Sequence, residues 1–242
     1  MERRLVLTGL AASLLTACET LDPAILDGVL GGTGGATGFG LTQADAALGI
    51  RAALDKGVGN AVTTVGVLDG FLGNNLVRIP LPSILQNVQS YLAPIGADGL
   101  LVELQQQLNR GAEKAVPVAK DVFLGAISQL TIPDAIAIVR GGETAATTYL
   151  QDRTSRQLNA LFSPIMEGAL NDTGALRLVD QVTSNLQGVP FAPQLGNGRQ
   201  DLISHGVDYG LRGLFYYVGE EEKAIRANPA SRTSEILRRV FA

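Results

Sequence analysis

Apolar residues recur at spacings of three and four along most of the chain after residue 41, and this pattern constrains the fold more than any other feature. In the first such segment the repeating positions are Ile50, Leu54, Val58, Ala61, Val62 and Val65. This spacing places the side chains on one face of an α-helix, whereas a half-buried strand alternates apolar and polar residues. Sustained alternation is almost absent. We therefore predict an all-α protein, with a single compact domain of about eight to ten helices at residues 41–242.

Capping residues and helix breakers give the expected helix boundaries. Capping pairs that begin a helix are predicted at Thr42 with Asp45, at Thr131 with Asp134, and at 154–157, "TSRQ". The glycines that follow Arg140 are expected to end a helix. Pro117 is expected either to kink a long helix or to begin the next one.

The remaining helices follow from the same apolar spacing. They are expected at 81–92, 101–115, 176–186 and 201–227, with a closing helix after residue 228. The turn-rich segment 69–82, "DGFLGNNLVRIPLP", is expected to connect the first two helices. The inner face of the helix at 201–227 is expected to hold Val207, Leu211, Leu214, Phe215, Val218 and Ile225.

The N-terminus has the pattern of a bacterial lipoprotein signal. Arg3 and Arg4 precede an apolar stretch, 5–15, which is shorter than the ~20 residues that a membrane span needs. The sequence "LTAC", ending at Cys18, resembles the lipobox, which implies a diacylglyceryl group on the Cys18 sulfur and an acyl chain such as palmitate on the new amino terminus. We therefore predict a signal peptide at 1–17 and a lipid anchor on Cys18.

Two alternatives remain at this terminus. The chain can carry an ordinary cleaved signal with a chance cysteine, or an N-terminal helix that buries Cys18. The pair of arginines also resembles a twin-arginine signal, so the export route stays open. Glu19 favours the outer membrane over the inner, because the usual sorting rule retains lipoproteins with Asp at this position in the inner membrane. We place the domain on the periplasmic side of the cell envelope.

A glycine-rich segment separates the predicted anchor from the predicted domain. Residues 28–40, "GVLGGTGGATGFG", contain seven glycines in thirteen positions. Such a segment buries too little apolar area to offset the entropy of ordering. We predict that residues 18–40 form a flexible tether. A phosphate-binding glycine loop would need a preceding strand and a following Lys-Ser/Thr pair, and neither is present.

Composition excludes several classes of function. The net charge of −4 argues against nucleic acid as a partner, because phosphate binding needs a basic surplus. Removal of 1–17 leaves 17 basic and 22 acidic side chains, a net charge of −5. One His and one Cys cannot form the usual zinc sites. We predict no metal, no cofactor and no catalytic set.

Two polar features, the single histidine and a run of three glutamates, are explained by structural roles without a ligand. His205, the single imidazole, lies near the apolar side of a predicted helix and is expected to be a packed or surface residue. The carboxylates of Glu220, Glu221 and Glu222 point about 100° apart on a helix. They are expected to form a solvated face, with Glu222 reaching Arg226 at i+4.

Two segments contain the candidate ligand or partner residues. In "LNRGAEKA", Asn109, Arg110 and Glu113 lie among small residues, and Asn109 and Glu113 share a helix face. Around a glycine break and a helix start lie Arg140, Glu143, Tyr149 and Arg153, where free N–H groups and arginines can bind an anion. Arg226 and Arg232 add two basic groups near the C-terminus. Internal caps and salt bridges between helices explain the same residues without a ligand.

Several of these segments resemble the family of bacterial proteins known as domain of unknown function 4197. The matching stretches are "GLTQADAALGIRAAL", "DGFLGNNLVRIPLP", "LNRGAEKAVPVAKDVF", "GGETAATTYLQDRTS", "LFSPIM" and "GLFYYVGEEEKAIRANPASRTSEILRRVF". They extend from about Gly40 to the C-terminus. The resemblance implies a signal-bearing protein of the bacterial envelope and implies no particular activity.

Together these features predict a lipid-anchored, periplasm-facing helical module that binds a protein partner or an amphiphilic ligand. One alternative is an enzyme that uses Arg, Glu and Tyr on an anionic or phosphorylated envelope substrate, which we favour less. Another is a structural envelope component. Convergence of the candidate residues in one concave pocket would favour a ligand or an enzyme. Their use in caps and salt bridges would favour a partner, and an apolar tunnel would favour lipid.

Overall fold

In the computed structural model the described residues are 43–96, 98–172, 174–177, 179–180 and 198–227. Several predictions lie outside these residues and stay predictions. They are the signal peptide at 1–17, the lipid on Cys18, the tether at 18–40, the Thr42 cap, most of the helix at 176–186, the closing helix after 228, and Arg232. The described helices belong to one compact unit, Leu41–Ala242.

The described chain is all-α, as predicted, and contains no strand in the described ranges. Its elements are α2 (Gln43–Val65), α3 (Ser83–Leu92), the 3₁₀-helix η1 (Ala93–Ile95), α4 (Gly99–Ser128), α5 (Ile132–Arg140), α6 (Ala145–Asp172) and α8 (Gly198–Ala227). These seven helices are fewer than the eight to ten expected. The difference arises because two predicted helices lie wholly or mostly outside the described residues.

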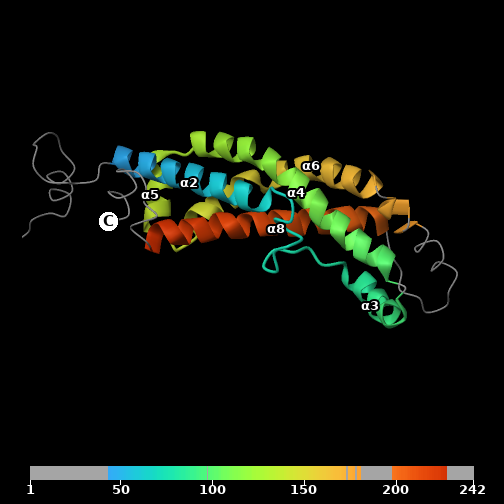
Figure 1. Ribbon diagram of the computed structural model, residues 1–242. Helices are drawn as coiled ribbons and strands as arrows, with labels where there is room; N and C mark the ends of the chain where they lie inside the picture. The colour runs from blue at the N-terminus through green and yellow to red at the C-terminus, as the bar shows by residue number, and fades with distance from the viewer. Residues whose placement is uncertain (1–42, 97, 173, 178, 181–197, 228–242) are drawn as a thin grey trace, which may run out of the picture. The chain divides into compact units, whose positions relative to one another are not determined.

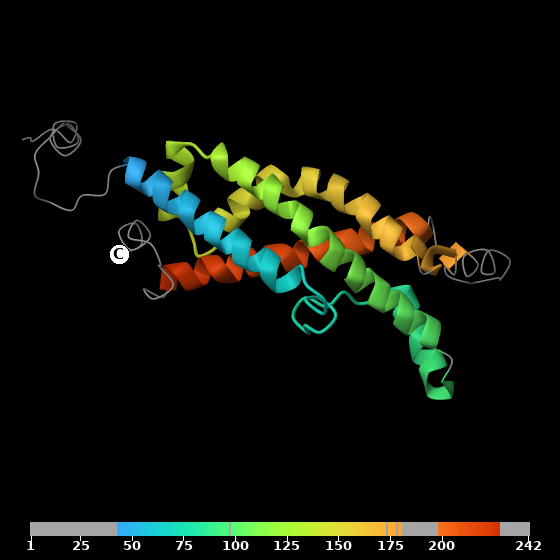
Figure 2. The same cartoon turned by 45° about the horizontal axis from the view of Figure 1, so that its top comes forward.

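Four long helices form the body of the fold (Figures 1 and 2). α4 packs along α6, and α8 packs against α2, α4 and α6. α5 packs against α2 and α6 at one end, whereas α3 lies beside the start of α4 at the other (Figure 2). The largest fully buried side chains include Phe71, Phe123, Phe162, Leu108, Leu158 and Met166.

Glycines let three of these helices approach closely around Met166 of α6. A Cβ atom on Gly111 of α4 would lie 2.5 Å from the Met166 sulfur. A Cβ atom on Gly206 of α8 would lie 2.9 Å from the same sulfur. Such separations are below van der Waals contact, so a side chain at either position would require Met166 to move. The small residues that the sequence places around Gly111 therefore serve helix packing.

The capping pair at Thr131 and Asp134 is confirmed. The Asp134 N–H donates to Thr131 Oγ1 over 3.3 Å, and the Thr131 N–H donates to Asp134 Oδ2 over 3.0 Å. The hydrogen bond from the Thr131 side chain lowers the pKa of Asp134, with a further contribution from the Thr131 backbone. α5 ends at Arg140, as the following glycines predict.

Two predicted boundaries differ from the structure. The capping box predicted at 154–157 is wrong, because these residues lie inside α6, where the Thr154 hydroxyl donates to the Leu150 carbonyl over 2.7 Å. Pro117 lies inside α4, so the alternative that it begins a new helix is also wrong. A proline in a helix interior removes one N–H bond. In α4 the helix continues past this loss to Ser128.

α8 has the predicted inner face. All six predicted residues, Val207, Leu211, Leu214, Phe215, Val218 and Ile225, are buried. Among the described residues, no single helix is both long enough and apolar enough to cross a membrane. α4 and α5, bent by 106° at their junction, meet the length and composition requirement only when taken together.

Candidate functional site

Residues 66–82 connect α2 to α3 without a helix or strand, and we call this segment the strap. Its buried side chains include Phe71, Val77 and Ile79. In contrast, Leu68 and Leu76 are 75% and 70% exposed. The strap therefore anchors one set of apolar side chains in the core and presents another to solvent.

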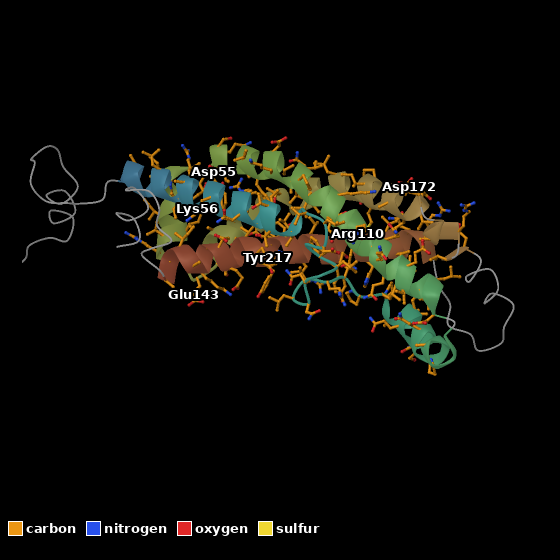
Figure 3. The ribbon with its side chains drawn as sticks, viewed as in Figure 1. Asp55, Lys56, Arg110, Glu143, Asp172 and Tyr217 are labelled. Atoms are coloured by element: carbon orange, nitrogen blue, oxygen red, sulfur yellow. The ribbon has the colours of Figure 1, made fainter. Side chains whose placement is uncertain are left out.

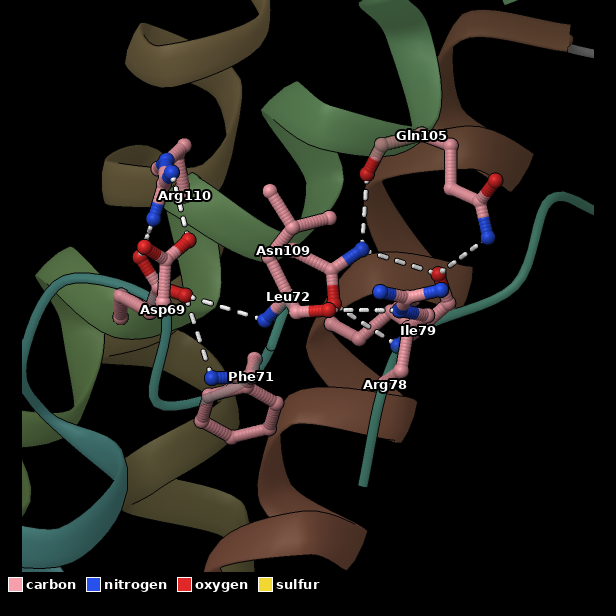
Figure 4. A network of polar contacts seen from close by, with 9 residues as sticks. Asp69, Phe71, Leu72, Arg78, Ile79, Gln105, Asn109 and Arg110 are labelled. Atoms are coloured by element: carbon pink, nitrogen blue, oxygen red, sulfur yellow. Dashed lines mark hydrogen bonds and ion pairs between the residues drawn. The ribbon is translucent and has the colours of Figure 1, made fainter. Parts of the chain in front are cut away.

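Asn109 of α4 binds the strap at Ile79. Its side-chain oxygen accepts from the Ile79 N–H over 2.8 Å, and its side-chain nitrogen donates to the Ile79 carbonyl over 3.0 Å (Figure 4). The same nitrogen donates to the Gln105 carbonyl over 2.7 Å. An amide side chain presents a donor and an acceptor side by side, so it can satisfy both polar groups of one backbone residue. Asn109 is fully buried and all of these bonds are internal.

Glu113, one turn further along α4, binds the strap at a second point. Its Oε1 atom accepts from the N–H groups of Phe71 and Leu72, each over 3.1 Å, and Figure 4 labels these two strap residues at the ends of the dashed lines. Asn109 and Glu113 therefore share a helix face, as predicted. The side chain of Glu113 is only 5% exposed. A carboxylate with so little contact with water is tolerated where hydrogen bonds and a counter-charge replace its hydration.

Arg110 supplies the counter-charge. It contacts Glu113 Oε2 at 2.7 Å and Asp69 Oδ1 of the strap at 2.8 Å. The hydrogen bond to Glu113 is the main cause that raises the pKa of Arg110 above its ordinary value. Asp69 has a left-handed backbone with φ of 65°, a conformation that Asp adopts more readily than most residues. Arg110 thus fixes the turn at the beginning of the strap.

α8 holds the other side of the strap. Tyr217 accepts from the Asn74 side-chain amide over 2.6 Å, and His205 Nε2 donates to the Pro80 carbonyl over 2.7 Å. A Cβ atom on Gly213 would lie 2.6 Å from the Phe71 ring, so this glycine lets the strap approach α8. Arg110 and Tyr217 extend from α4 and α8, respectively (Figure 3). His205 is a half-buried packing residue in the helix, as expected.

A second polar cluster lies where α5, α6 and α8 meet. Glu222 of α8 accepts from the N–H groups of Ala146 and Thr147, over 3.0 and 2.8 Å, at the start of α6. Arg226 donates to Glu222 over 2.8 Å and to the Ile138 carbonyl over 2.9 Å. Two N–H groups at this helix start, which were candidates for binding an anion, are therefore bound by an internal carboxylate, in agreement with the alternative of an internal cap.

The three consecutive glutamates diverge, as predicted. Glu220 pairs with Lys223 at 2.8 Å, a bond that raises the pKa of Lys223, and Glu221 accepts from Asn60 of α2 over 2.8 Å. Glu222 pairs with Arg226, also as predicted, but it is buried, so the expectation of a solvated face is wrong for this residue. Across the described residues, no group of three or more His, Cys, Asp or Glu side chains is placed to hold a metal ion.

Tyr149 and Arg153 line a hollow of about 400 Å³ between α4 and α6, which we call the groove. The Arg153 guanidinium lies 5.4 Å from the centre of the Tyr149 ring. Burial is the main cause that raises the pKa of the Tyr149 hydroxyl, so this group remains a hydrogen-bond donor at neutral pH. The α4 side contributes Asp121, Gly125 and Gln129 among others.

The described candidate residues therefore separate into distinct places instead of one pocket. Asn109, Arg110 and Glu113 bind the strap, and Arg226 binds the start of α6 through Glu222. Arg140 and Glu143 are exposed at the turn between α5 and α6, where Figure 3 shows Glu143 near the C-terminal end of α8. Of the candidate residues predicted from the sequence, only Tyr149 and Arg153 line the groove.

Sequence reasoning missed several residues of these sites. No local sequence pattern indicated that Glu222 caps α6. None indicated the groove residues Asp121, Gly125, Gln129 and Gln157 either. Tyr217 was also missed as a strap ligand. The available signal for the strap was a buried-face Asn and Glu four residues apart, beside a connector with many turn residues.

The arrangement defines an all-α protein in which an irregular strap is clamped between two long helices. The family model described as "Protein of unknown function (DUF4197)" matches residues 40–242, and the chain belongs to this family. No curated protein and no solved structure matches the chain.

Proposed function

We propose that the chain is a lipid-anchored protein of the bacterial cell envelope whose helical domain binds another envelope protein through the strap. Export by residues 1–17, acylation of Cys18 and an outer-membrane position are parts of this proposal. The lipobox-like sequence, Glu19 and the glycine-rich segment at 28–40 support them.

The observation that carries the binding function is the combination of a tightly held strap and exposed apolar side chains on it. Leu68, Leu76 and Val67 are 75%, 70% and 51% exposed. Buried Asn109 and Glu113 hold the backbone that carries them. A pre-ordered loop loses little conformational entropy on binding, which favours affinity. Loops held by a rigid scaffold often carry binding residues, and apolar residues that gather on an exposed surface mark protein-docking sites.

A protein partner has more support than an amphiphile or a membrane surface. The apolar cavity between α2 and α8, lined by Ile50, Leu54 and Val218, measures only about 10 Å³, too little for an acyl chain. The net charge of −5 after signal removal disfavours adhesion to anionic lipid. The enzyme alternative has less support, because Arg226 is engaged in internal bonds.

Acylation is tested by metabolic labelling with an alkynyl palmitate analogue. We expect the wild-type chain to be labelled and to be found in the membrane fraction. The Cys18→Ser chain should carry no label. Equal labelling of both chains would contradict the anchor.

Partner binding is tested with a photo-crosslinking residue at Leu68 or Leu76 of the full chain in its own cells. A matched control is Leu48 of α2, which is 56% exposed. We expect an adduct of one mass from the strap positions and none from Leu48. Purified Cys18→Ser chain should compete for the partner and prevent the adduct. The Cys18→Ser chain that also carries Leu68→Ser and Leu76→Ser should not prevent it. Failure of this competition, or flotation of the Cys18→Ser chain with phosphatidylethanolamine–phosphatidylglycerol vesicles, would reject the protein partner.

A further inference from the structure

The groove between α4 and α6 has the size and shape of a small-ligand site. Its volume of about 400 Å³ falls within the range of ~300–1,000 Å³ that ligand pockets occupy. α4 forms one wall with Asp121, Gly125 and Gln129, and α6 forms the other with Tyr149, Arg153 and Gln157. None of these residues belongs to the strap.

Gly125 leaves the α4 wall of the groove open. A Cβ atom added at Gly125 would have no neighbour within 4 Å. Gly111 on the same helix faces Met166 instead, and the Met166 side chain fills the space that a side chain at Gly111 would occupy. The space over Gly125 is therefore accessible to a ligand.

The polar groups of the groove are arranged along its length. α4 and α6 run antiparallel (Figure 2). Gly111 lies against Met166 and Ala169, whereas residues 121–129 face residues 149–157. Three levels follow, with Gln129 beside Tyr149, Gly125 beside Arg153, and Asp121 beside Gln157. Each level is four residues from the next, which is about 6 Å along a helix.

Opposite charges in the groove are available for a ligand. Within the described part of the chain, Arg153 makes no direct ion pair; its guanidinium is held beside the Tyr149 ring, and the Asp134 carboxylate interacts with it only from a longer distance. Asp121 is exposed and has no ion pair with a described residue. Arg153 and Tyr149 together suit an oxyanion, and Asp121 suits an ammonium group. The amides of Gln129 and Gln157 can bind the polar atoms of a ligand at either end.

We propose that the groove is a binding site for a small zwitterion, whose oxyanion pairs with Arg153 and Tyr149 and whose primary ammonium pairs with Asp121. Along the helices the two charged residues are one level apart, about 6 Å of axial rise, and they extend from opposite walls of the groove. A dipeptide carries its two charges at opposite ends, and because an extended residue spans ~3.3–3.6 Å, it is long enough to cover this axial offset. A phosphoethanolamine group offers the same chemistry from a lipid source.

The test is a calorimetric titration of the full-length chain, purified in detergent, with Ala-Ala and separately with phosphoethanolamine. We expect millimolar or tighter binding of at least one probe, because a ligand of this size offers few atoms. N-acetyl-Ala-Ala and Ala-Ala amide, which each lack one charge, should bind about tenfold more weakly or worse. The preferred probe identifies the source of the zwitterion.

Matched variants place the ligand in the groove. Arg153→Gln, Asp121→Asn and the groove-filling Gly125→Trp should each weaken binding by about tenfold or more. Gly168→Trp is the control, because Gly168 of α6 also has no neighbour within 4 Å but lies outside the groove. The proposal is overturned if neither probe binds, if the singly charged analogues bind equally well, or if Gly125→Trp binds like Gly168→Trp.

Discussion

The two halves of α4 use polar residues in opposite ways. In the N-terminal half, Asn109 and Glu113 are buried and bind the backbone of the strap. In the C-terminal half, Asp121 lines an open groove together with Gln129, the residue that follows the helix. The glycines differ in the same sense, since Gly111 contacts Met166 and Gly125 faces empty space. Polar residues that look alike in sequence thus maintain the architecture in one half and remain available to a ligand in the other.

The largest effect is expected from Glu113→Ala. This change leaves the N–H groups of Phe71 and Leu72 without their acceptor and Arg110 without its closest partner. Breaking a buried charged network in this way lowers the free energy of unfolding by about 3–5 kcal/mol. Urea unfolding measures the loss. Glu103→Ala, at an exposed position of the same helix, should change stability by no more than about 0.5 kcal/mol. If the two variants were equally stable, the N-terminal half would not be a clamp.

A smaller loss is expected from Gly213→Ala, on the α8 side of the strap. The new Cβ atom would lie 2.6 Å from the Phe71 ring and 3.0 Å from the Val77 Cβ atom. Overpacking of this kind destabilises by about 1–3 kcal/mol, more than the helix propensity of Ala recovers. Thermal unfolding measures the change. A variant as stable as the wild type would mean that the strap moves away from α8 without loss.

Asp134→Asn tests a local cap near the groove. The lowered pKa of Asp134 means that its carboxylate stabilises the folded state above the unfolded-state pKa of about 3.9, and that this contribution is lost as the pH falls through the lower folded-state pKa. We expect a loss of about 0.5–1 kcal/mol at neutral pH, which disappears in strong acid. Thermal unfolding at both pH values measures it. Asp55→Asn on α2 controls for removal of one charge, and a pH-independent difference between the two variants would contradict the cap.

The smallest effect, of opposite sign, is expected from Gly125→Ala. No neighbour lies within 4 Å of the added methyl group, so only the helix propensity changes. We expect a gain of about 0.5–1 kcal/mol. Comparison with Gly213→Ala in the same unfolding assay tests the contrast directly. Destabilisation by Gly125→Ala would mean that the space beside Gly125 is filled.

Much of the fold follows from local sequence patterns. The Thr131 cap, the end of α5 and the inner face of α8 depend on residues close together in the chain, and all three were predicted correctly. The start of α6 was predicted nine residues too late, at Thr154 in place of Ala145. Its cap comes from Glu222, which lies 75 residues from Thr147, so no local pattern reveals it.

The sites were less predictable than the helices. The spacing of Asn109 and Glu113 indicated a shared face, but their partners lie 30 and 41–42 residues away in a segment without regular structure. The groove exists because no side chain occupies the space beside Gly125. A sequence pattern does not reveal such an empty volume. Tyr149 and Arg153 were singled out because of their polar groups and their place near a glycine break and a helix start, and the structure assigns them a different neighbour, α4.

The clamp also determines how the strap exchanges its amide hydrogens with solvent. Segments without helix or strand usually exchange quickly, because local opening requires little free energy. The amides of Phe71 and Ile79 are buried and bound to Glu113 and Asn109, so they open only when the strap leaves α4. Their exchange should be as slow as that of the helical core, whereas the amide of Val67, a residue that is 51% exposed, should exchange early. An irregular segment would then belong to the last part of the molecule to open.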